Sequence, residues 1–339
     1  MTSAHPETIP LVLSDTEYLV EPLPEIWFGV VILALGGYLL LDGFDFGLGI
    51  LYAEADDDER ETMLAAFGPV WKANEVWLVL FGTVLLAGFP EVYANLLSRH
   101  YLLAFAILLA LILRGLGAKL REEDVGDRWV RFWDRCFVTG SVLAPFLLGT
   151  FVASWILGAP SALAIGPILV GITVVILTVV LGAAFLAVKT DGELRERAVH
   201  RGRVATGCYV LALVLTAVVL YVQYPNLGPT LLSIPTAVIV LATIGFSGIG
   251  VYAGAASRYR DLVLASGGIA VAFVGLVAHL LYPAIDPAAG LVIRDAIVSP
   301  LALNLASIMA AVFLPVIGFY FVFLYSLFRG PPRPTDGYV

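Results

Sequence analysis

Long runs of apolar residues alternate with short polar segments along the whole chain. A transmembrane helix needs about 20 mostly apolar residues, and nine stretches of roughly that length are present. The runs are continuously apolar, whereas the strands of a membrane barrel alternate between apolar and polar residues. The pattern therefore predicts an all-α, polytopic membrane helical bundle with about nine transmembrane helices. The nine predicted spans are Ile26–Tyr52, Ala65–Phe89, Tyr101–Leu120, Phe132–Leu157, Ala162–Val188, Ala205–Tyr224, Leu231–Ala253, Leu262–Tyr282 and Ala302–Phe328.

The overall composition indicates one membrane-embedded domain in the lipid bilayer. Of the 339 residues, 60% are hydrophobic and only 14% are charged. A soluble domain carries about 25% charged residues, so two soluble domains are excluded. The net charge of −8 also excludes a nucleic-acid surface, which would be basic. We expect a polar extracytoplasmic tail over residues 1–24, a nine-helix domain over 25–328 and a cytoplasmic tail over 329–339. The first tail is not expected to be a cleavable signal peptide, because it lacks a basic segment.

The distribution of Lys and Arg predicts the orientation in the membrane. Loops after odd-numbered spans, together with the C-terminal tail, hold fifteen of the nineteen basic residues. The opposite side holds only Arg99 and Arg294, and the remaining two lie within spans. Because cytoplasmic loops carry the excess of Lys and Arg, the N-terminus is predicted outside and the C-terminus inside. The fifteen residues are Arg60, Lys119, Arg121, Arg128, Arg131, Arg135, Lys189, Arg195, Arg197, Arg201, Arg203, Arg258, Arg260, Arg329 and Arg333.

Five charged residues within the first three spans are predicted to meet at one depth. Asp42 and Asp45 are three residues apart near the end of the first span, so they share a helix face. Lys72 and Glu75 begin the second span, and Arg114 lies about 20 Å into the third at a rise of about 1.5 Å per residue. One interpretation is a set of ion pairs or side chains that reach the headgroups. The other is a polar entrance that passes protons from the cytoplasm, since intramembrane ionisable groups often mark proton paths.

The chain is poor in residues that ligate haem or other metals. The four histidines are His5, His100, His200 and His279. Of these, only His279 is expected to be deep in the membrane, and Met309 is the only other soft candidate within a span. Cys136 and Cys208 have no metal-ligand spacing and suggest no disulfide framework. The chain itself is therefore expected to bind neither metal nor haem, and any haems belong to a partner chain.

Four sequence blocks carry a resemblance to a known family. The first span contains Leu-Asp-Gly-Phe-Asp-Phe-Gly-Leu-Gly at residues 41–49, and the second begins Trp-Lys-Ala-Asn-Glu-Val-Trp-Leu at residues 71–78. Phe-Pro-Glu-Val-Tyr-Ala at residues 89–94 and Leu-Arg-Gly at residues 113–115 follow. Their order and spacing resemble subunit II of cytochrome bd-type quinol oxidases. The nine-span count fits the resemblance over the whole length.

The resemblance implies a haem-free subunit of an electrogenic terminal oxidase of aerobic respiration. In that family a homologous subunit I carries haem b and haem d and oxidises quinol, and oxygen is reduced to water with cytoplasmic protons. Subunit II packs against subunit I as a heterodimer in the plasma membrane of a prokaryote and contributes polar residues to a proton path. Some relatives hold a structural quinone in subunit II. The residues assigned to the path here are Asp42, Asp45, Glu75 and Arg114, with Lys72 left open.

Lys72 is a departure from the family pattern. The block usually reads Trp-Asp-Gly-Asn, with the Asp implicated in proton movement, whereas residues 71–74 read Trp-Lys-Ala-Asn. A lysine does not replace a carboxylate relay at pH 7 unless its pKa is strongly depressed. Either Lys72 pairs with one of the three carboxylates assigned to the path, or protons enter another way.

Two other functions compete with the oxidase interpretation. In a secondary transporter the charge cluster would form the binding site, and the two halves of the chain often show matching broken helices. The charges here crowd the first third of the chain without a visible counterpart in the second half, which counts against transport. In a purely structural scaffold, the charges would only stabilise a partner.

Overall fold

The computed structural model describes residues 15–123, 126–159 and 161–327. The predicted cytoplasmic tail over residues 329–339, with Arg329 and Arg333, and the first part of the predicted outer tail lie outside these residues. All regular secondary structure in the described ranges is helical, which confirms the predicted fold class. The long helices are α1 (Leu23–Leu51), α3 (Trp71–Gly88), α5 (Tyr101–Leu120), α6 (Asp127–Leu157), α7 (Ile165–Lys189), α8 (Gly192–Gln223), α10 (Ile234–Ala255), α11 (Tyr259–Leu281) and α13 (Pro300–Leu327). The short helices are η2 (Tyr52–Glu54), α2 (Asp57–Phe67), α4 (Pro90–Arg99), η3 (Arg121–Glu123), η4 (Pro225–Leu227), α9 (Gly228–Leu231) and α12 (Ile293–Ala296).

The number of spans agrees with the prediction of about nine. In the described part of the chain, eight helices are long and apolar enough to cross a membrane. A ninth span results when α2 and α3 are counted together. These two helices bend by 52° at a break that contains Pro69, which has no amide hydrogen to donate. The predicted second span, Ala65–Phe89, was therefore wrong as one straight helix, since its first residues belong to α2.

The predicted start of the sixth span at Ala205 is also wrong, because α8 begins at Gly192 and includes most of the polar segment before Ala205. The polar first turns of α8 extend beyond the apolar part of the helix. Arg197 forms an ion pair with Glu59 of α2, and Arg201 forms one with Glu54 of η2. The charges of this segment thus connect α8 to the α2 region.

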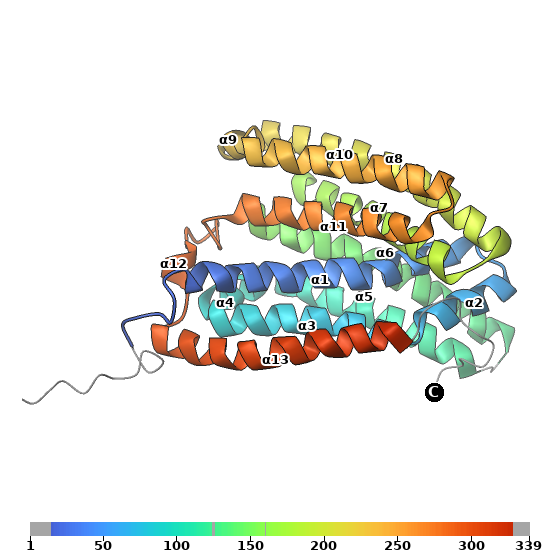
Figure 1. Ribbon diagram of the computed structural model, residues 1–339, viewed down its shortest axis with the longest axis horizontal. Coiled ribbons are helices and arrows are strands. Elements are labelled where there is room, and N and C mark those ends of the chain that lie inside the picture. Colours follow the sequence, from blue (N-terminus) through green and yellow to red (C-terminus); the bar gives the residue numbers. More distant parts are fainter. Residues whose placement is uncertain (1–14, 124–125, 160, 328–339) are drawn as a thin grey trace, which may run out of the picture.

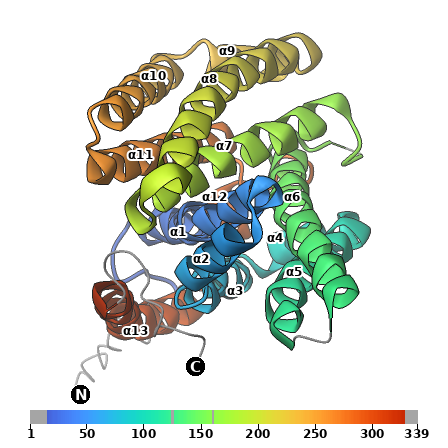
Figure 2. The ribbon, with the colours of Figure 1, turned by 90° about the vertical axis from the view of Figure 1, so that its right-hand side faces the viewer.

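Helix α1 lies at the centre of the bundle and packs on α3, α6, α7 and α11 (Figures 1 and 2). Its approach to α7 is very close, because a Cβ atom on Gly47 would overlap the Thr178 carbonyl oxygen. Gly182 faces Gly47 from the α7 side. Glycines at such positions let helix backbones approach where little hydrophobic driving force acts between helices. Helix α13 lies at the margin, beside α3 (Figure 2).

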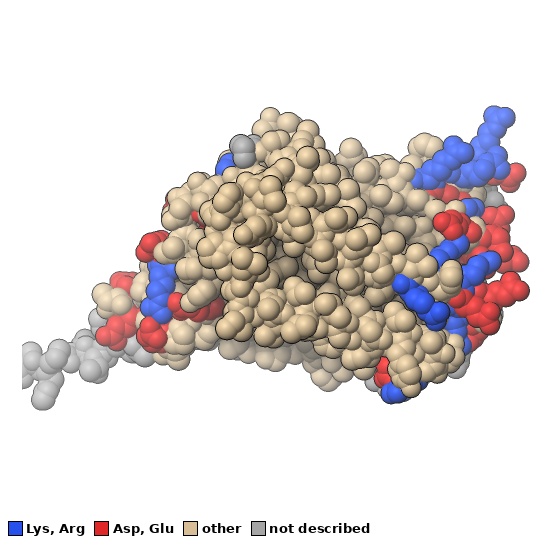
Figure 3. Space-filling model, turned by 90° about the horizontal axis from the view of Figure 1, so that it is seen from above, with Lys and Arg blue, Asp and Glu red and all other residues tan. Residues whose placement is uncertain are grey.

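Charged side chains gather at the two ends of the bundle, with an apolar belt between them (Figure 3). We call the end that holds α2 the α2 end, and the end that holds α12 and the start of α1 the α12 end (Figure 1). The α2 end carries the larger number of Lys and Arg side chains in this view. The belt matches the surface expected of a chain surrounded by acyl chains.

Candidate functional site

A fully buried ion pair joins α1 to α5. Arg114 Nη1 donates a hydrogen bond of 2.6 Å to Asp42 Oδ1, and both side chains have no exposed surface. The guanidinium carbon also lies 4.3 Å from the centre of the Phe46 ring. The arginine is held in place by close helix packing, because a Cβ atom on Gly140 of α6 would be 2.5 Å from the Arg114 backbone nitrogen. The pair therefore lies between α1, α5 and α6.

Asp45 is the second buried carboxylate of α1. Asn74 of α3 donates a hydrogen bond of 2.8 Å from Nδ2 to Asp45 Oδ2. The same amide nitrogen lies 3.2 Å from the Leu41 carbonyl oxygen, so the Asn74 side chain is oriented by two acceptors on α1. Asn74 and Asp45 have no exposed surface. The sequence block at residues 71–78 thus supplies a direct partner for the acidic block of α1.

Glu75 links this cluster to the surface. Its Oε1 lies 3.5 Å from Arg114 Nη2, and its side chain is 32% exposed while that of Arg114 is fully buried. Lys72, one turn earlier, is exposed, and its ammonium lies 5.8 Å from the centre of the Trp71 ring. It forms no ion pair with a carboxylate of the described residues. The structure therefore brings four of the five predicted site residues together and leaves Lys72 outside.

Several polar atoms of this cluster have no hydrogen-bond partner among the described residues. They are Asp42 Oδ2, Asp45 Oδ1 and Arg114 Nε. Buried polar groups normally bind protein or ordered water, so each such atom needs explanation. Three carboxyl groups face one guanidinium here, with two carboxylate oxygens left to bind a proton or a water molecule. The arrangement has the chemical groups needed to accept a proton and pass it on.

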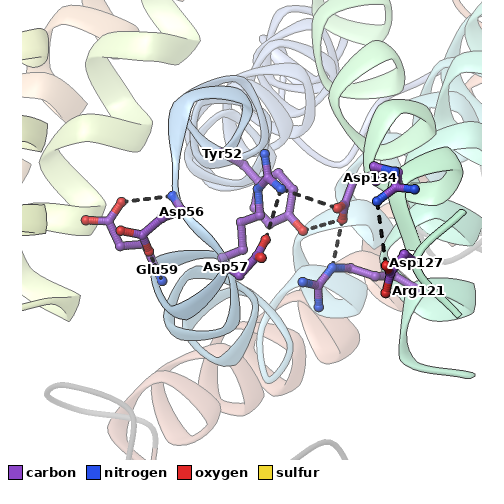
Figure 4. Close-up of polar contacts among 9 residues, drawn as sticks. Tyr52, Asp56, Asp57, Glu59, Arg121, Asp127 and Asp134 are labelled. Carbon is purple, nitrogen blue, oxygen red and sulfur yellow. Dashed lines mark hydrogen bonds and ion pairs between the residues drawn. The ribbon is translucent and has the colours of Figure 1, made fainter. Parts of the chain in front are cut away.

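A second polar cluster, which the sequence analysis missed, lies at the α2 end (Figure 4). The Tyr52 hydroxyl donates a hydrogen bond of 2.5 Å to Asp134 Oδ1, and Arg121 Nε donates one of 2.7 Å to the same oxygen. Arg60 Nη1 lies 3.6 Å from Asp134 Oδ2. One signal in the sequence pointed to it: Asp134 is an acidic residue in the first turn of a predicted span, beside Arg135.

A third cluster lies toward the α12 end. Arg99 of α4 binds both carboxylate oxygens of Asp286, which has no exposed surface. The neighbouring His100 is 7% exposed, and its pKa is lowered by burial and by the charge of Arg99, with Asp286 acting in the opposite direction. His279, predicted to be the only deep histidine, is less buried and its Nε2 lies 3.0 Å from Ser233 Oγ. His279 lies within α11, whereas His100 lies between α4 and α5, so the burial of His100 comes from packing at the end of the bundle.

Comparison with known proteins identifies the family. A family model for cytochrome bd terminal oxidase subunit II matches residues 23–328. The chain belongs to this family. Cytochrome bd ubiquinol oxidase subunit 2 of Bacillus subtilis is 28% identical over 328 residues, which cover 91% of this chain and 96% of that protein. Cytochrome bd-I ubiquinol oxidase subunit 2 of Escherichia coli strain K12 is 30% identical over 214 residues, 57% of this chain and 56% of that protein. A probable cytochrome oxidase subunit 2 of Haemophilus influenzae is 30% identical over 219 residues, 59% of this chain and 58% of that protein.

Membership in the subunit II family makes the chain part of a respiratory oxidoreductase complex that contains haem. The described residues of this subunit II contain no group of three or more His, Cys, Asp or Glu side chains placed to hold a metal ion. Two apolar cavities between α1, α6, α7, α8 and α11 have volumes of about 40 and 50 Å³. Pockets for drug-sized ligands measure about 300–1,000 Å³, so neither cavity fits a haem or a quinone.

Proposed function

We propose that this chain is the haem-free subunit II of a quinol:oxygen oxidoreductase. It supports a haem-bearing subunit I and conducts protons from the cytoplasm through Asp42, Asp45 and Glu75. Haem b and haem d on subunit I supply the electron transfer and the reduction of oxygen. The observation that carries the proposal is the buried Asp42–Arg114 pair, connected to the surface by Glu75, in a member of this family.

The proposed orientation places the α2 end in the cytoplasm of a prokaryotic cell. The excess of basic side chains at this end supports it, because Lys and Arg accumulate on the cytoplasmic side (Figure 3). The predicted outer tail over residues 1–24 and cytoplasmic tail over 329–339 follow from the same orientation. With the α2 end inside, Glu75 opens toward the cytoplasmic half of the membrane.

Each residue of the cluster has a defined part in the proposed proton transfer. Glu75 exchanges protons with the surface, because about a third of its side chain is exposed. Arg114 holds Glu75 and Asp42 on either side of one guanidinium. Asn74 orients Asp45 so that its Oδ1 stays free of protein hydrogen bonds among the described residues. We assign Lys72 no relay role, since it lies outside the cluster.

We assign the margin formed by α13 and α3 to the contact with subunit I. Helix α13 is anchored near its start, where Trp27 Nε1 donates a hydrogen bond of 2.8 Å to Ser307 Oγ. Further along, Phe321 packs against Trp77 of α3, with ring centroids 5.4 Å apart. Large side chains such as Phe319 and Phe323 are exposed on the rest of the helix. A helix with so little intramolecular packing is suited to a protein partner in the membrane.

Quinol is the proposed electron donor of the complex and is oxidised on subunit I. The resemblance allows a structural quinone in subunit II, but the two interior cavities are too small for one. We therefore derive no step from a quinone within this chain.

The proposal is tested with Asp42→Asn and Asp45→Asn in the complex purified with subunit I. The second variant keeps the Asp42–Arg114 pair intact. We expect normal haem b and haem d bands in the reduced-minus-oxidised spectrum. Quinol-driven oxygen consumption should fall on the order of a hundredfold, at the lower end of the losses seen when a proton-transfer group is removed. Proton uptake in liposomes should fall in parallel.

Asp191→Asn is the matched control, because its carboxylate is 66% exposed and pairs with Arg195 on the surface. It should leave the rate unchanged. Full activity of both assembled cluster variants would contradict the proton path and favour the purely structural scaffold. The secondary-transporter alternative has no support from the family match, which names an oxidase.

A further inference from the structure

Polar side chains continue from the cluster toward the α2 end along one face of α1. Asp45, Gly49 and Tyr52 follow one another at spacings of four and three residues, so they lie in one row on the helix. This row faces α6, because Gly49 packs against Ser141 and Tyr52 binds Asp134. The two helices run in opposite directions, so the row on α1 is matched by a row on α6.

Ser141 lies at the middle of this contact. The residue has no exposed surface, and its hydroxyl has no hydrogen-bond partner among the described residues. A Cβ atom at Gly49 would overlap the Ser141 hydroxyl, so only glycine leaves room for this group against α1. The adjacent Gly140 packs on the backbone of Arg114. Ser141 therefore lies about one turn of α1 from Asp45, whose Oδ1 also has no hydrogen-bond partner among the described residues.

Asp134 and Tyr52 form the other end of the row. The Asp134 side chain is 9% exposed, and it is joined to the surface by Arg60, whose side chain is 24% exposed. In Figure 4 the Tyr52 hydroxyl and the Arg121 side chain both point to the Asp134 carboxylate. The Arg60 guanidinium carbon also lies 5.2 Å from the centre of the Tyr52 ring. Asp134 thus connects the partly exposed Arg60 to the Tyr52 hydroxyl.

We propose that Asp134, Tyr52 and Ser141 form an entry arm that brings protons from the α2 end to Asp45. The inference rests on the proposed proton path and adds its entrance. A carboxylate, a phenol and an aliphatic hydroxyl each accept one proton as they release another, so the arm transfers a proton without a net change in any group. Its beginning is Asp134, and its end is the unpartnered Oδ1 of Asp45.

Phe137 separates the two parts of the arm. Its ring packs edge-on against Tyr52 with centroids 5.2 Å apart, and its Cζ would lie 3.3 Å from a Cβ atom at position 49. Transfer from Tyr52 to Ser141 therefore requires water beside this ring. Tyr52 and Ser141 hold the hydroxyls on which that water would be bound.

The charge of Lys72 makes the arm the more favourable entrance. Lys72 is exposed one turn before Glu75, so its ammonium stands near the opening on the α3 side. A fixed positive charge at the opening of a proton path lowers the local concentration of protons there. At the other entrance the arginines contact Asp134, so their charges are partly neutralised by a carboxylate. Glu75 then remains a second, less favourable point of proton exchange with the surface.

The test uses Tyr52→Phe and Ser141→Ala in the intact complex reconstituted in liposomes. Both variants keep the packing and remove only a hydroxyl. Each should lower quinol-driven oxygen consumption and proton uptake on the order of a hundredfold, and the double variant should be no slower than the slower single one. The solvent deuterium isotope effect on the rate should rise in each, and Ser141→Thr should restore the rate.

Tyr209→Phe and Ser266→Ala are matched controls, since both side chains are buried in helices on the other side of the bundle. They should have no effect. Unchanged rates in Tyr52→Phe and Ser141→Ala, with a slow Asp45→Asn, would overturn the arm and leave the proposed function standing. A slow Ser141→Ala without a changed isotope effect or rescue by Thr would also overturn it. A fully active Asp45→Asn would also overturn the arm, and full activity of Asp42→Asn as well would contradict the proposed proton path.

Discussion

The two halves of the bundle differ in the polar side chains that they bury. The half that contains α1, α3, α5 and α6 buries Asp42, Asp45 and Arg114 at membrane depth. The half that contains α7, α8, α10 and α11 buries only hydrophobic side chains and the hydroxyls of Ser, Thr and Tyr209, as far as the structure describes it. Many of these hydroxyls bond to a carbonyl one turn earlier, as Thr173 does to Leu169. The second half shows that helices of this bundle pack without buried charge.

The comparison teaches that the charges of the first half are not needed for packing. Buried ionisable groups in a membrane are costly, so their presence in one half only favours a functional role. The first small cavity is lined mostly by α1 and α6, and the second mostly by α7, α8 and α11. We expect the two halves to respond differently when their polar groups are removed.

The largest effect is expected from Arg114→Met. The substitution leaves the charge of Asp42 buried without a partner, and breaking a buried ion pair costs about 3–5 kcal/mol. The assembled complex should be recovered in low yield and should lose activity at a lower temperature. The measurement is the midpoint of thermal inactivation of the purified complex. Arg131→Met is the control, since its guanidinium is 60% exposed, and equal midpoints for both variants would contradict the comparison.

A smaller loss is expected from Gly47→Ala, which acts on the contact between α1 and α7. The added methyl would overlap the Thr178 carbonyl oxygen, so the two helices must separate. Overpacking typically costs about 1–3 kcal/mol. The same inactivation midpoint reports the effect, with Gly29→Ala as the control on the same helix, because a Cβ atom there meets nothing within 4 Å. If Gly47→Ala were as stable as Gly29→Ala, the close approach of α1 and α7 would be in doubt.

The smallest effect is expected from Thr173→Val in the apolar half. The substitution removes a hydroxyl that lies 3.1 Å from Thr216 Oγ1. Interhelical hydrogen bonds of this kind contribute about 0.6 kcal/mol on average in membrane proteins. The inactivation midpoint should fall slightly, and the oxidase rate of the assembled complex should equal that of the wild type. A large fall in the rate would mean that the apolar half also carries function.

Much of the fold follows from local properties of the chain. The predicted third span and α5 have the same bounds, Tyr101–Leu120. The number of spans and the common depth of Asp42 and Arg114 follow from the length of apolar runs and the constant rise of a helix. The sequence analysis missed the bend between α2 and α3 and the helical start of α8. Both involve polar helical segments outside the apolar belt, which lack the hydrophobic run on which the span prediction depends.

The sequence by itself determined that this protein is a helical membrane bundle with charges at one level of its first spans. It also carried the motifs that resemble the family. Only the tertiary structure decided that Arg114 binds Asp42, that Lys72 faces outward and that Ser141 meets Gly49. The physical reason is that the sequence determines the position of a residue along the helix axis, because each residue adds a constant rise. Which neighbour the residue meets depends on how each helix is rotated and packed against the others.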